Sequence, residues 1–183
     1  MSYGTSQECE DAVACEEQIT LTRDGKEYTV TASPCDADAL KKGFEYRAGN
    51  EETEPVQYPS ANDILKAMKS LLAVSDSYKM TGNIHCSALC KGAKIIYCGE
   101  DIGRSNSVYK AIGKSLLNGE NPSSFYLCTT GRIHKNIMDI AIASGIGCVV
   151  SRSAVTDLAI DMAVDNNIRL YGFARENKLN EYN

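Results

Sequence analysis

Short apolar runs alternate with amphipathic stretches along the second half of the chain. The runs that have the length and composition of buried strands lie at 93–98, 125–128, 147–150 and 168–173. Apolar residues at helical spacing follow the first three runs, at 106–117, 133–143 and 155–164. Because strands that alternate with helices are joined by right-handed crossovers, this pattern predicts an α/β fold with a largely parallel sheet covered by helices.

A smaller unit precedes this core. Residues 18–32 alternate between apolar and polar on both sides of the turn signal Asp24-Gly25, which predicts a β-hairpin. Ser33-Pro34 then offers a capping hydroxyl followed by proline, which predicts a helix start at this point. The helix is expected to present Leu40 and Phe44 on one face.

These patterns divide the chain into three parts. Residues 1–17 are polar and acidic, which predicts a disordered tail. Residues 18–59 form a small N-terminal β/α portion that ends in an acidic, proline-bearing connector. A capping box made by Ser60 and Asp63 then opens the first helix of an α/β core over residues 60–183.

The composition excludes several classes of protein. No apolar run reaches the roughly 18–20 residues that cross a bilayer, and the N-terminus lacks the basic and apolar regions of a signal peptide. A net charge of -5 argues against non-specific binding to nucleic acid. The 8 cysteines are irregularly spaced, which is typical of reduced thiols rather than of a disulfide framework. We therefore expect a cytoplasmic protein that binds neither membrane nor nucleic acid.

Three strand-to-helix junctions carry the same kind of loop, each with small residues, hydroxyls and an arginine. They lie at 99–106, 129–132 and 151–156. A helix N-terminus has unpaired N–H groups and a partial positive charge, and an arginine adds a planar fork of donors for phosphate. One such loop is explained equally well by a capped helix with a solvent-exposed arginine. Three of them beyond the carboxyl ends of neighbouring strands predict a site for a polyphosphate or nucleotide-like ligand.

The remaining polar residues allow more than one interpretation. The glycine-rich signatures of dinucleotide-binding and P-loop proteins are both absent from the sequence. His85 is either a structural hydrogen-bonding residue or a site residue, whereas His134 is interpreted as a surface residue that opens a helix. Cys86 and Cys90 would share one face of a helix and, with His85, would offer three zinc ligands. Their spacing matches no common zinc motif, so we predict no tightly bound metal.

Cys98, Cys128 and Cys148 lie in apolar strands and are expected to be buried free thiols.

Several of these segments occur in the same order in a known family. They are Ser33-Pro34 to Phe44, Thr81-Gly82-Asn83-Ile84-His85, Glu100-Asp101-Ile102-Gly103-Arg104 with Asn106 and Lys110, Gly131-Arg132, Ser151-x-Ser153-Ala154-x-Thr156 and Gly172-Phe173-x-Arg175. Together they extend over most of the chain after Gln18. The chain therefore resembles the formate dehydrogenase accessory proteins, the FdhD/NarQ sulfurtransferase family.

The resemblance implies a three-layer core similar to the cytidine-deaminase fold. It also implies that sulfur is received from a cysteine desulfurase and passed to the molybdenum cofactor (bis-molybdopterin guanine dinucleotide) before that cofactor enters formate dehydrogenase. By this resemblance Arg104, Arg132 and Ser153 would hold phosphates, and His85 and Phe173 would line the pocket. The cofactor-binding residues that the resemblance implies are Thr81, Gly82, His85, Asp101, Gly103, Arg104, Asn106, Gly131, Arg132, Ser151, Ser153, Thr156 and Phe173. A homodimer is expected by the same analogy.

The chain departs from the family where sulfur is carried. The family's Cys-x-x-Cys lies between the upstream helix and the Thr-Gly-Gly run, and this sequence contains no Cys-x-x-Cys. Persulfide transfer needs an accessible thiolate, for which Cys35, Cys86 and Cys90 are the candidates. We therefore expect a sulfurtransferase with a relocated thiol. The alternative is a relative that binds the molybdenum cofactor or a guanine nucleotide without moving sulfur. A zinc deaminase is excluded, because neither His-x-Glu nor Pro-Cys-x-x-Cys is present.

Overall fold

The computed structural model describes residues 13–49, 58–75 and 81–183. Most of the predicted tail and of the acidic connector lies outside these residues. The N-terminal elements are β1 (Glu17–Arg23), β2 (Lys26–Ala32) and α1 (Ala37–Glu45). The elements that follow are α2 (Ala61–Val74), β3 (His85–Lys91), β4 (Lys94–Asp101), α4 (Arg104–Leu117), the 3-10 turn η1 (Pro122–Ser124), β5 (Tyr126–Thr129), α5 (Lys135–Ala143), β6 (Cys148–Ser151), α6 (Asp157–Asp165), β7 (Arg169–Arg175) and β8 (Lys178–Glu181).

Strands β3 to β8 form a mixed sheet in the order β4-β3-β5-β6-β7-β8, and β1 and β2 form the predicted hairpin. The β5–β6 and β6–β7 pairs are parallel, whereas β3–β4, β3–β5 and β7–β8 are antiparallel. The prediction of a largely parallel sheet is therefore wrong. It fails because two-residue turns at 92–93 and 176–177 join β3 to β4 and β7 to β8. A turn of that length returns the chain antiparallel to itself.

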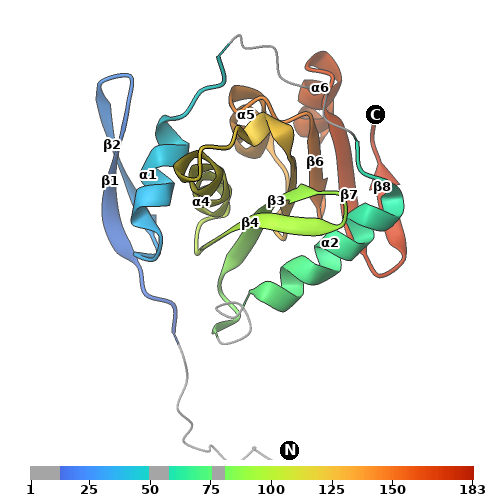
Figure 1. Cartoon of the computed structure of the whole chain (residues 1–183), viewed down its shortest axis with the longest axis horizontal. Coiled ribbons are helices and arrows are strands. Elements are labelled where there is room, and N and C mark those ends of the chain that lie inside the picture. Colours follow the sequence, from blue (N-terminus) through green and yellow to red (C-terminus); the bar gives the residue numbers. More distant parts are fainter. Residues whose placement is uncertain (1–12, 50–57, 76–80) are drawn as a thin grey trace, which may run out of the picture.

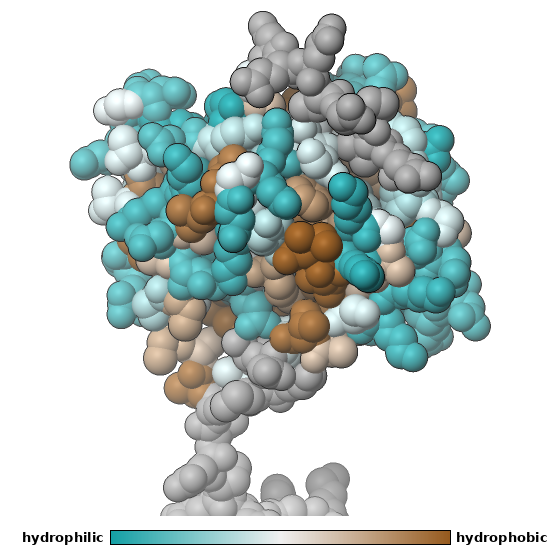
Figure 2. Space-filling view, in the orientation of Figure 1, coloured by the Kyte–Doolittle hydropathy of each residue, from teal (hydrophilic) through white to brown (hydrophobic). Residues whose placement is uncertain are grey.

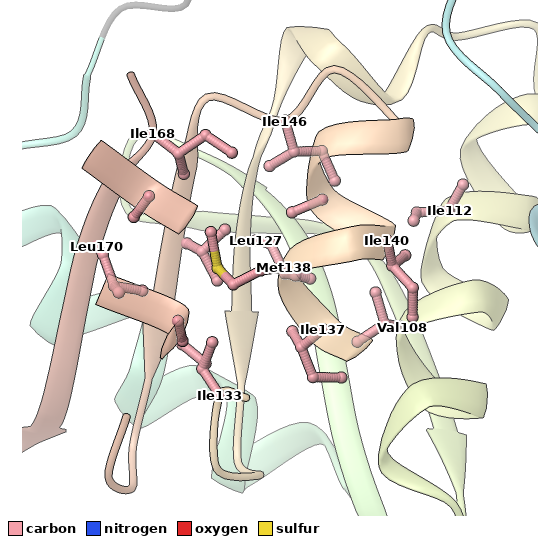
Figure 3. Close-up of a cluster of buried hydrophobic side chains, with 14 of the residues drawn as sticks. Val108, Ile112, Leu127, Ile133, Ile137, Met138, Ile140, Ile146, Ile168 and Leu170 are labelled. Carbon is pink, nitrogen blue, oxygen red and sulfur yellow. The ribbon is translucent and has the colours of Figure 1, made fainter. Parts of the chain in front are cut away.

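Helices α4, α5 and α6 cover one face of this sheet. Their apolar residues pack against the inward-facing side chains of the central strands, such as Leu127 of β5. Figure 3 shows Val108 and Ile112 of α4 directed towards Ile137 and Ile140 of α5 in this cluster. The predicted alternation of strands and helices is thus confirmed for this half of the chain.

Helix α2 covers the opposite face of the sheet. The predicted capping box is present, because the Ser60 side chain accepts the backbone N–H of Asp63 at 3.1 Å. Ile64, Met68 and Leu71 of α2 are buried in a cluster that also contains the strand cysteines. The sheet therefore has helices on both faces, and α2 crosses in front of it in Figure 1.

The N-terminal hairpin and α1 pack on the outer side of α4, away from β7 and β8 (Figure 1). Helices α1 and α4 approach so closely that a Cβ at Gly43 would lie 1.9 Å from the carbonyl oxygen of Tyr109. A Cβ at Gly113 would likewise lie 1.8 Å from the carbonyl oxygen of Ala39. Glycines at these two positions therefore set the distance between the helices.

Helix α1 begins later than the sequence predicts. Its N-cap is Asp36, in the left-handed region with φ 57, and no side chain caps its first turn. Ser33 does not cap the helix because its own backbone is engaged elsewhere. Its N–H donates to Asp101 Oδ2 at 3.0 Å, and its carbonyl accepts from Lys110 Nζ at 2.9 Å. These two bonds hold the segment before Ala37 outside the helix.

In Figure 2, apolar side chains gather in the middle of the displayed face and are bordered by hydrophilic ones. On the edge strand β4, Ile96 is 41% exposed. Among the described residues, no helix is both long enough and apolar enough to span a membrane.

Candidate functional site

The carboxyl ends of four strands meet at one edge of the sheet. Because β4 and β5 are both antiparallel to β3, strands β4, β5, β6 and β7 all run in the same direction. The loops after β4, β5 and β6 are the three arginine-bearing junctions, and they lead into α4, α5 and α6. Strand β3 starts at this edge, where His85 pairs with Asp101 at the end of β4. The three loops therefore line one edge, as the sequence predicts, and His85 joins them from an antiparallel strand.

Backbone hydrogen bonds tie the second loop to the third. Ile133 and Val155 form a parallel bridge just before α5 and α6. Closer to the strands, the N–H of Arg152 donates to the carbonyl oxygen of Thr129 at 2.9 Å. These bonds hold the N-termini of the two helices side by side, so their free N–H groups face a common region.

The first loop meets the second through the side chain of Arg104. A Cβ at Gly131 would lie 2.9 Å from both Cγ and Cδ of Arg104, so any side chain at this position would displace Arg104 from where it lies. The backbone of Gly131 is itself fixed on both sides. Its N–H donates to Thr129 Oγ1 at 3.2 Å, and its carbonyl accepts from Ser151 Oγ at 2.7 Å. The stem of Arg104 therefore rests on a rigid backbone surface.

Arg104 and Arg132 place positive charge around both histidines of the chain. Burial is the main cause that lowers the pKa of His85, and the two guanidinium groups lower it further against the opposing charge of Asp101. The pKa of His134 is lowered by burial first and then by the same two arginines. His134 also caps α5, which confirms its interpretation as a helix-start residue. A bound anion would neutralise the positive charge that the two arginines concentrate here.

A pocket of about 260 Å³ opens at this edge, lined by residues that include Gly82, His85, Thr130 and Arg152. The Nε atom of Arg152 is buried and has no hydrogen-bond partner within the part of the chain that the structure describes. A buried donor without a partner is uncommon, and an anionic oxygen would satisfy it. Arg152 is not among the predicted binding residues, although the presence of an arginine in each of the three loops is the sequence signal that marks it.

Several predicted binding residues make their hydrogen bonds within the protein. Oδ1 of Asp101 accepts the N–H of Gly103 at 2.8 Å and Nδ2 of Asn106 at 3.1 Å. Its Oδ2 lies 2.6 Å from Lys110 Nζ. The hydroxyl of Thr156 caps α6. In this structure these side chains shape the loops from which Arg104, Arg132 and Arg152 project.

Phe173 brings the closing strand β7 to the third loop. It lies at an irregularity in the β7–β8 pairing and has a φ of 52, which is uncommon for a bulky residue. Its N–H donates to the carbonyl oxygen of Ser153 at 2.9 Å. The charged ends of Arg175 and Lys178 lie 5.7 Å and 5.5 Å from the ring centroid. An aromatic face and two further cations therefore stand beside the loop that carries Ser153.

The candidate sulfur carriers lie in different surroundings. Cys86 and Cys90 belong to strand β3, so the interpretation that they share a helical face is wrong, and both are fully buried. Cys35 is exposed before α1.

The expectation of buried strand thiols is confirmed for Cys128 and Cys148, and burial raises the pKa of Cys148 to about 12. In the described residues, no group of three His, Cys, Asp or Glu side chains is arranged to hold a metal ion.

The chain is similar to known proteins over most of its length. The model of the FdhD/NarQ family matches residues 8–183. The chain is 41% identical to Protein FdhD of Methanocaldococcus jannaschii over 122 residues, which are 66% of this chain and 53% of that protein. It is 39% identical to the sulfur carrier protein FdhD of Listeria monocytogenes over 119 residues, 65% of this chain and 46% of the relative. The chain therefore spans about half the length of the curated relatives that it matches.

A solved structure supports the same assignment at the level of the fold. The crystal structure of a formate dehydrogenase accessory protein from Desulfotalea psychrophila superposes with a TM-score of 0.85 at 20% sequence identity. The superposition covers 100% of this chain and 93% of that one. With the match of the family model over nearly the whole sequence, these likenesses establish that the chain belongs to the FdhD/NarQ family.

Proposed function

We propose that this protein is a formate dehydrogenase accessory factor that receives sulfur from a cysteine desulfurase and delivers it to the molybdenum cofactor. The names of the relatives support the proposal. They are sulfur carrier protein FdhD and formate dehydrogenase accessory protein. The cofactor is the substrate of this reaction and carries guanine nucleotide and pyrophosphate groups. Cytoplasmic location stays a prediction of the composition, and a homodimer and a cytidine-deaminase-like core stay predictions of the family resemblance.

The observation that carries the proposal is the set of three arginine-bearing loops at one edge of the sheet. Arg104 lies on the glycine surface at Gly131, and Arg152 has a buried Nε without a partner in the described residues. Anions bind at helix N-termini, and a guanidinium group binds phosphate oxygens through paired hydrogen bonds. The pyrophosphate of a dinucleotide cofactor suits these groups, and His85 would face the same ligand from the start of β3.

The alternative is a relative that binds the molybdenum cofactor or a guanine nucleotide without moving sulfur. The absence of Cys-x-x-Cys from the sequence favours this alternative. The two proposals share the binding site and differ in whether any cysteine accepts sulfur.

The shared site is tested by measuring the affinity of the full chain for guanosine diphosphate with isothermal titration calorimetry. We expect Arg104→Ala and Arg152→Ala each to weaken binding about 10- to 100-fold, which corresponds to about 1.5 to 3 kcal/mol for a charged hydrogen bond. Arg47→Ala is the matched control, because Arg47 is exposed and its side chain donates to the adjacent carbonyl of Tyr46. Equal affinities in all four proteins would overturn the binding site.

A further inference from the structure

Two thiols outside the arginine-bearing loops lie in contact across the first hairpin of the sheet. Sγ of Cys86 on β3 is 3.1 Å from Sγ of Cys98 on β4. Cys86 pairs with Glu100, and Cys98 pairs with Ala88, so the two cysteines are diagonal neighbours across the antiparallel strands. Side chains at such diagonal positions project from the same face of a sheet and reach one another.

One thiol of this pair faces a pocket and the other lies beneath it. A pocket of about 230 Å³ is lined by Cys98, Cys35, Lys114 and Glu100, among others. Cys98 is partly exposed there, whereas Cys86 has no exposed surface. A reagent that enters this pocket therefore meets Cys98 first, and Cys86 is reached only through Cys98.

The same arrangement concentrates negative charge on the outer sulfur. The pKa of Cys98 is lowered from its ordinary value of 9.0, chiefly by the hydrogen bond between the two thiols, with a further contribution from Lys114. These effects outweigh burial and the nearby carboxylates of Glu100 and Asp36. The same hydrogen bond, together with burial, raises the pKa of Cys86. Of the two thiols, Cys98 is therefore the one that loses its proton more readily.

We propose that Cys98 accepts a sulfane sulfur from a persulfide donor in this pocket and that Cys86 is the thiol that releases it. The proposal rests on the proposed sulfur transfer and names the residues that replace the missing Cys-x-x-Cys. It also differs from the sequence-based candidates for the sulfur carrier, which were Cys35, Cys86 and Cys90, whereas Cys98 was expected to be a buried free thiol.

The chemistry needs a persulfide donor and a thiol reductant. The Cys98 thiolate attacks the terminal sulfur of the donor persulfide; the S–S bond of the donor breaks, the donor leaves as a thiolate, and Cys98 becomes a persulfide. Cys86 then passes its S–H proton to the departing terminal sulfur as its own sulfur attacks Cys98 Sγ. The Cys86–Cys98 disulfide forms, the S–S bond of the persulfide breaks, and the terminal sulfur leaves as hydrogen sulfide. The sulfane sulfur gains the two electrons that the two cysteines lose. Reduction of the disulfide by a dithiol returns both thiols to the starting state.

The pocket lies beside the proposed cofactor site. Ile84, which precedes β3, lines both the pocket of Cys98 and the pocket of His85 and Arg152. Sulfide released at Cys98 therefore starts next to the edge of the sheet at which the cofactor would bind. The disulfide step requires the two sulfur atoms to close from 3.1 Å to about 2.05 Å, a small movement of two side chains.

The experiment treats the full, reduced chain with inorganic polysulfide as the sulfane donor and locates the added sulfur by mass spectrometry of intact protein and peptides. In the wild type we expect a Cys86–Cys98 disulfide, with no persulfide that accumulates on Cys98. In Cys86→Ser we expect a persulfide that accumulates on Cys98 and is removed by reductant. In Cys98→Ser we expect at least a tenfold loss of both products. Cys15→Ser, a change at an exposed cysteine, serves as the control and is expected to behave as the wild type.

The outcomes separate this inference from the proposed function. Sulfur on Cys35 or another cysteine, with Cys98→Ser as active as the wild type, would overturn the assignment to Cys98 while sulfur transfer stands. No Cys86–Cys98 disulfide in the wild type, together with no added sulfur on any cysteine of Cys86→Ser, would overturn both. Cys86→Ala is tested beside Cys86→Ser, and circular dichroism establishes that each variant is folded, so that a lost product is not mistaken for lost structure.

Discussion

Lys110 Nζ lies 2.6 Å from Asp101 Oδ2, and neither side chain is exposed to solvent. The ammonium group also donates to the carbonyl oxygens of Ser33 at 2.9 Å and Glu100 at 3.2 Å. This buried ion pair therefore joins the segment before α1 to the first arginine-bearing loop. Two residues that belong to the family's sequence motif thus have a structural task, which is to hold the loop that carries Arg104.

Loss of the lysine is expected to destabilise the whole fold. Lys110→Met would leave the buried carboxylate of Asp101 without its cation, and we expect the free energy of unfolding to fall by about 3 to 5 kcal/mol in urea denaturation. Lys135→Met is the control. Lys135 Nζ lies 2.7 Å from Asp139 Oδ2, close to the 2.6 Å of the buried pair, but both side chains are about half exposed. The control should change stability by less than about 1 kcal/mol. Equal effects of the two substitutions would contradict a structural role for the buried pair.

The contact between α1 and α4 predicts a second destabilising change. Gly113→Ala places a methyl group 1.8 Å from a backbone carbonyl oxygen of α1, so the two helices have to separate. We expect a loss of about 1 to 3 kcal/mol in thermal or urea unfolding, the usual cost of an overpacked contact. Gly49→Ala, where no atom of residues 13–49, 58–75 or 81–183 lies within 4 Å of the new Cβ, provides the comparison. If Gly113→Ala were as stable as Gly49→Ala, the close approach of the helices would be refuted.

Because Gly131 lies beneath Arg104, its substitution is expected to weaken ligand binding with little change in stability. Gly131→Ala brings a methyl group to 2.9 Å from Cγ and Cδ of Arg104, a flexible side chain that moves aside at small cost. We expect at least a fivefold weaker affinity for guanosine diphosphate, while the melting temperature changes by only a few degrees. Gly147→Ala, whose nearest contact is 4.0 Å away, should leave the affinity as it is. Unchanged affinity in Gly131→Ala would exclude a role for the position of Arg104.

The two histidines report the charge of the site. Because burial and the arginines lower the pKa of His85, we expect its imidazole to titrate below 6.5 in an NMR pH titration, and Arg104→Ala or Arg132→Ala should raise that value. Addition of guanosine diphosphate should raise it too, since the bound phosphates neutralise the arginines. The chain has 2 histidines, so His134→Gln assigns the signals. A pKa of His85 that does not respond to either arginine would contradict the arrangement.

The same shift has a consequence for stability. Below pH 6.5 the unfolded state takes up a proton at His85 more readily than the native state does. The free energy of unfolding should therefore decrease as pH falls from 6.5 towards the lower native pKa, and level off below it. His85→Gln should remove this part of the pH dependence, which urea denaturation at several pH values would measure.

Local pattern was sufficient for much of the fold. The hairpin around Asp24-Gly25, the capping box at Ser60, and the strand–loop–helix units that carry Arg104, Arg132 and Arg152 each depend on residues close together in the chain. Their periodicity and caps express backbone sterics and hydrogen bonding within a few residues. For the same reason the loops and the family segments can be recognised from the sequence alone.

Long-range packing decided the rest. Three features depend on segments that are distant in sequence or lie on neighbouring strands. They are the direction of β3, the burial of the Asp101–Lys110 pair and the contact of Cys86 with Cys98. Periodicity indicates which side chains are apolar, but it does not state which strand lies beside which. A polar residue is free for a ligand only when no neighbour in the fold satisfies its hydrogen bonds. That condition distinguishes Arg152, whose buried Nε has no partner among the described residues, from Asp101, whose oxygens are engaged within the protein.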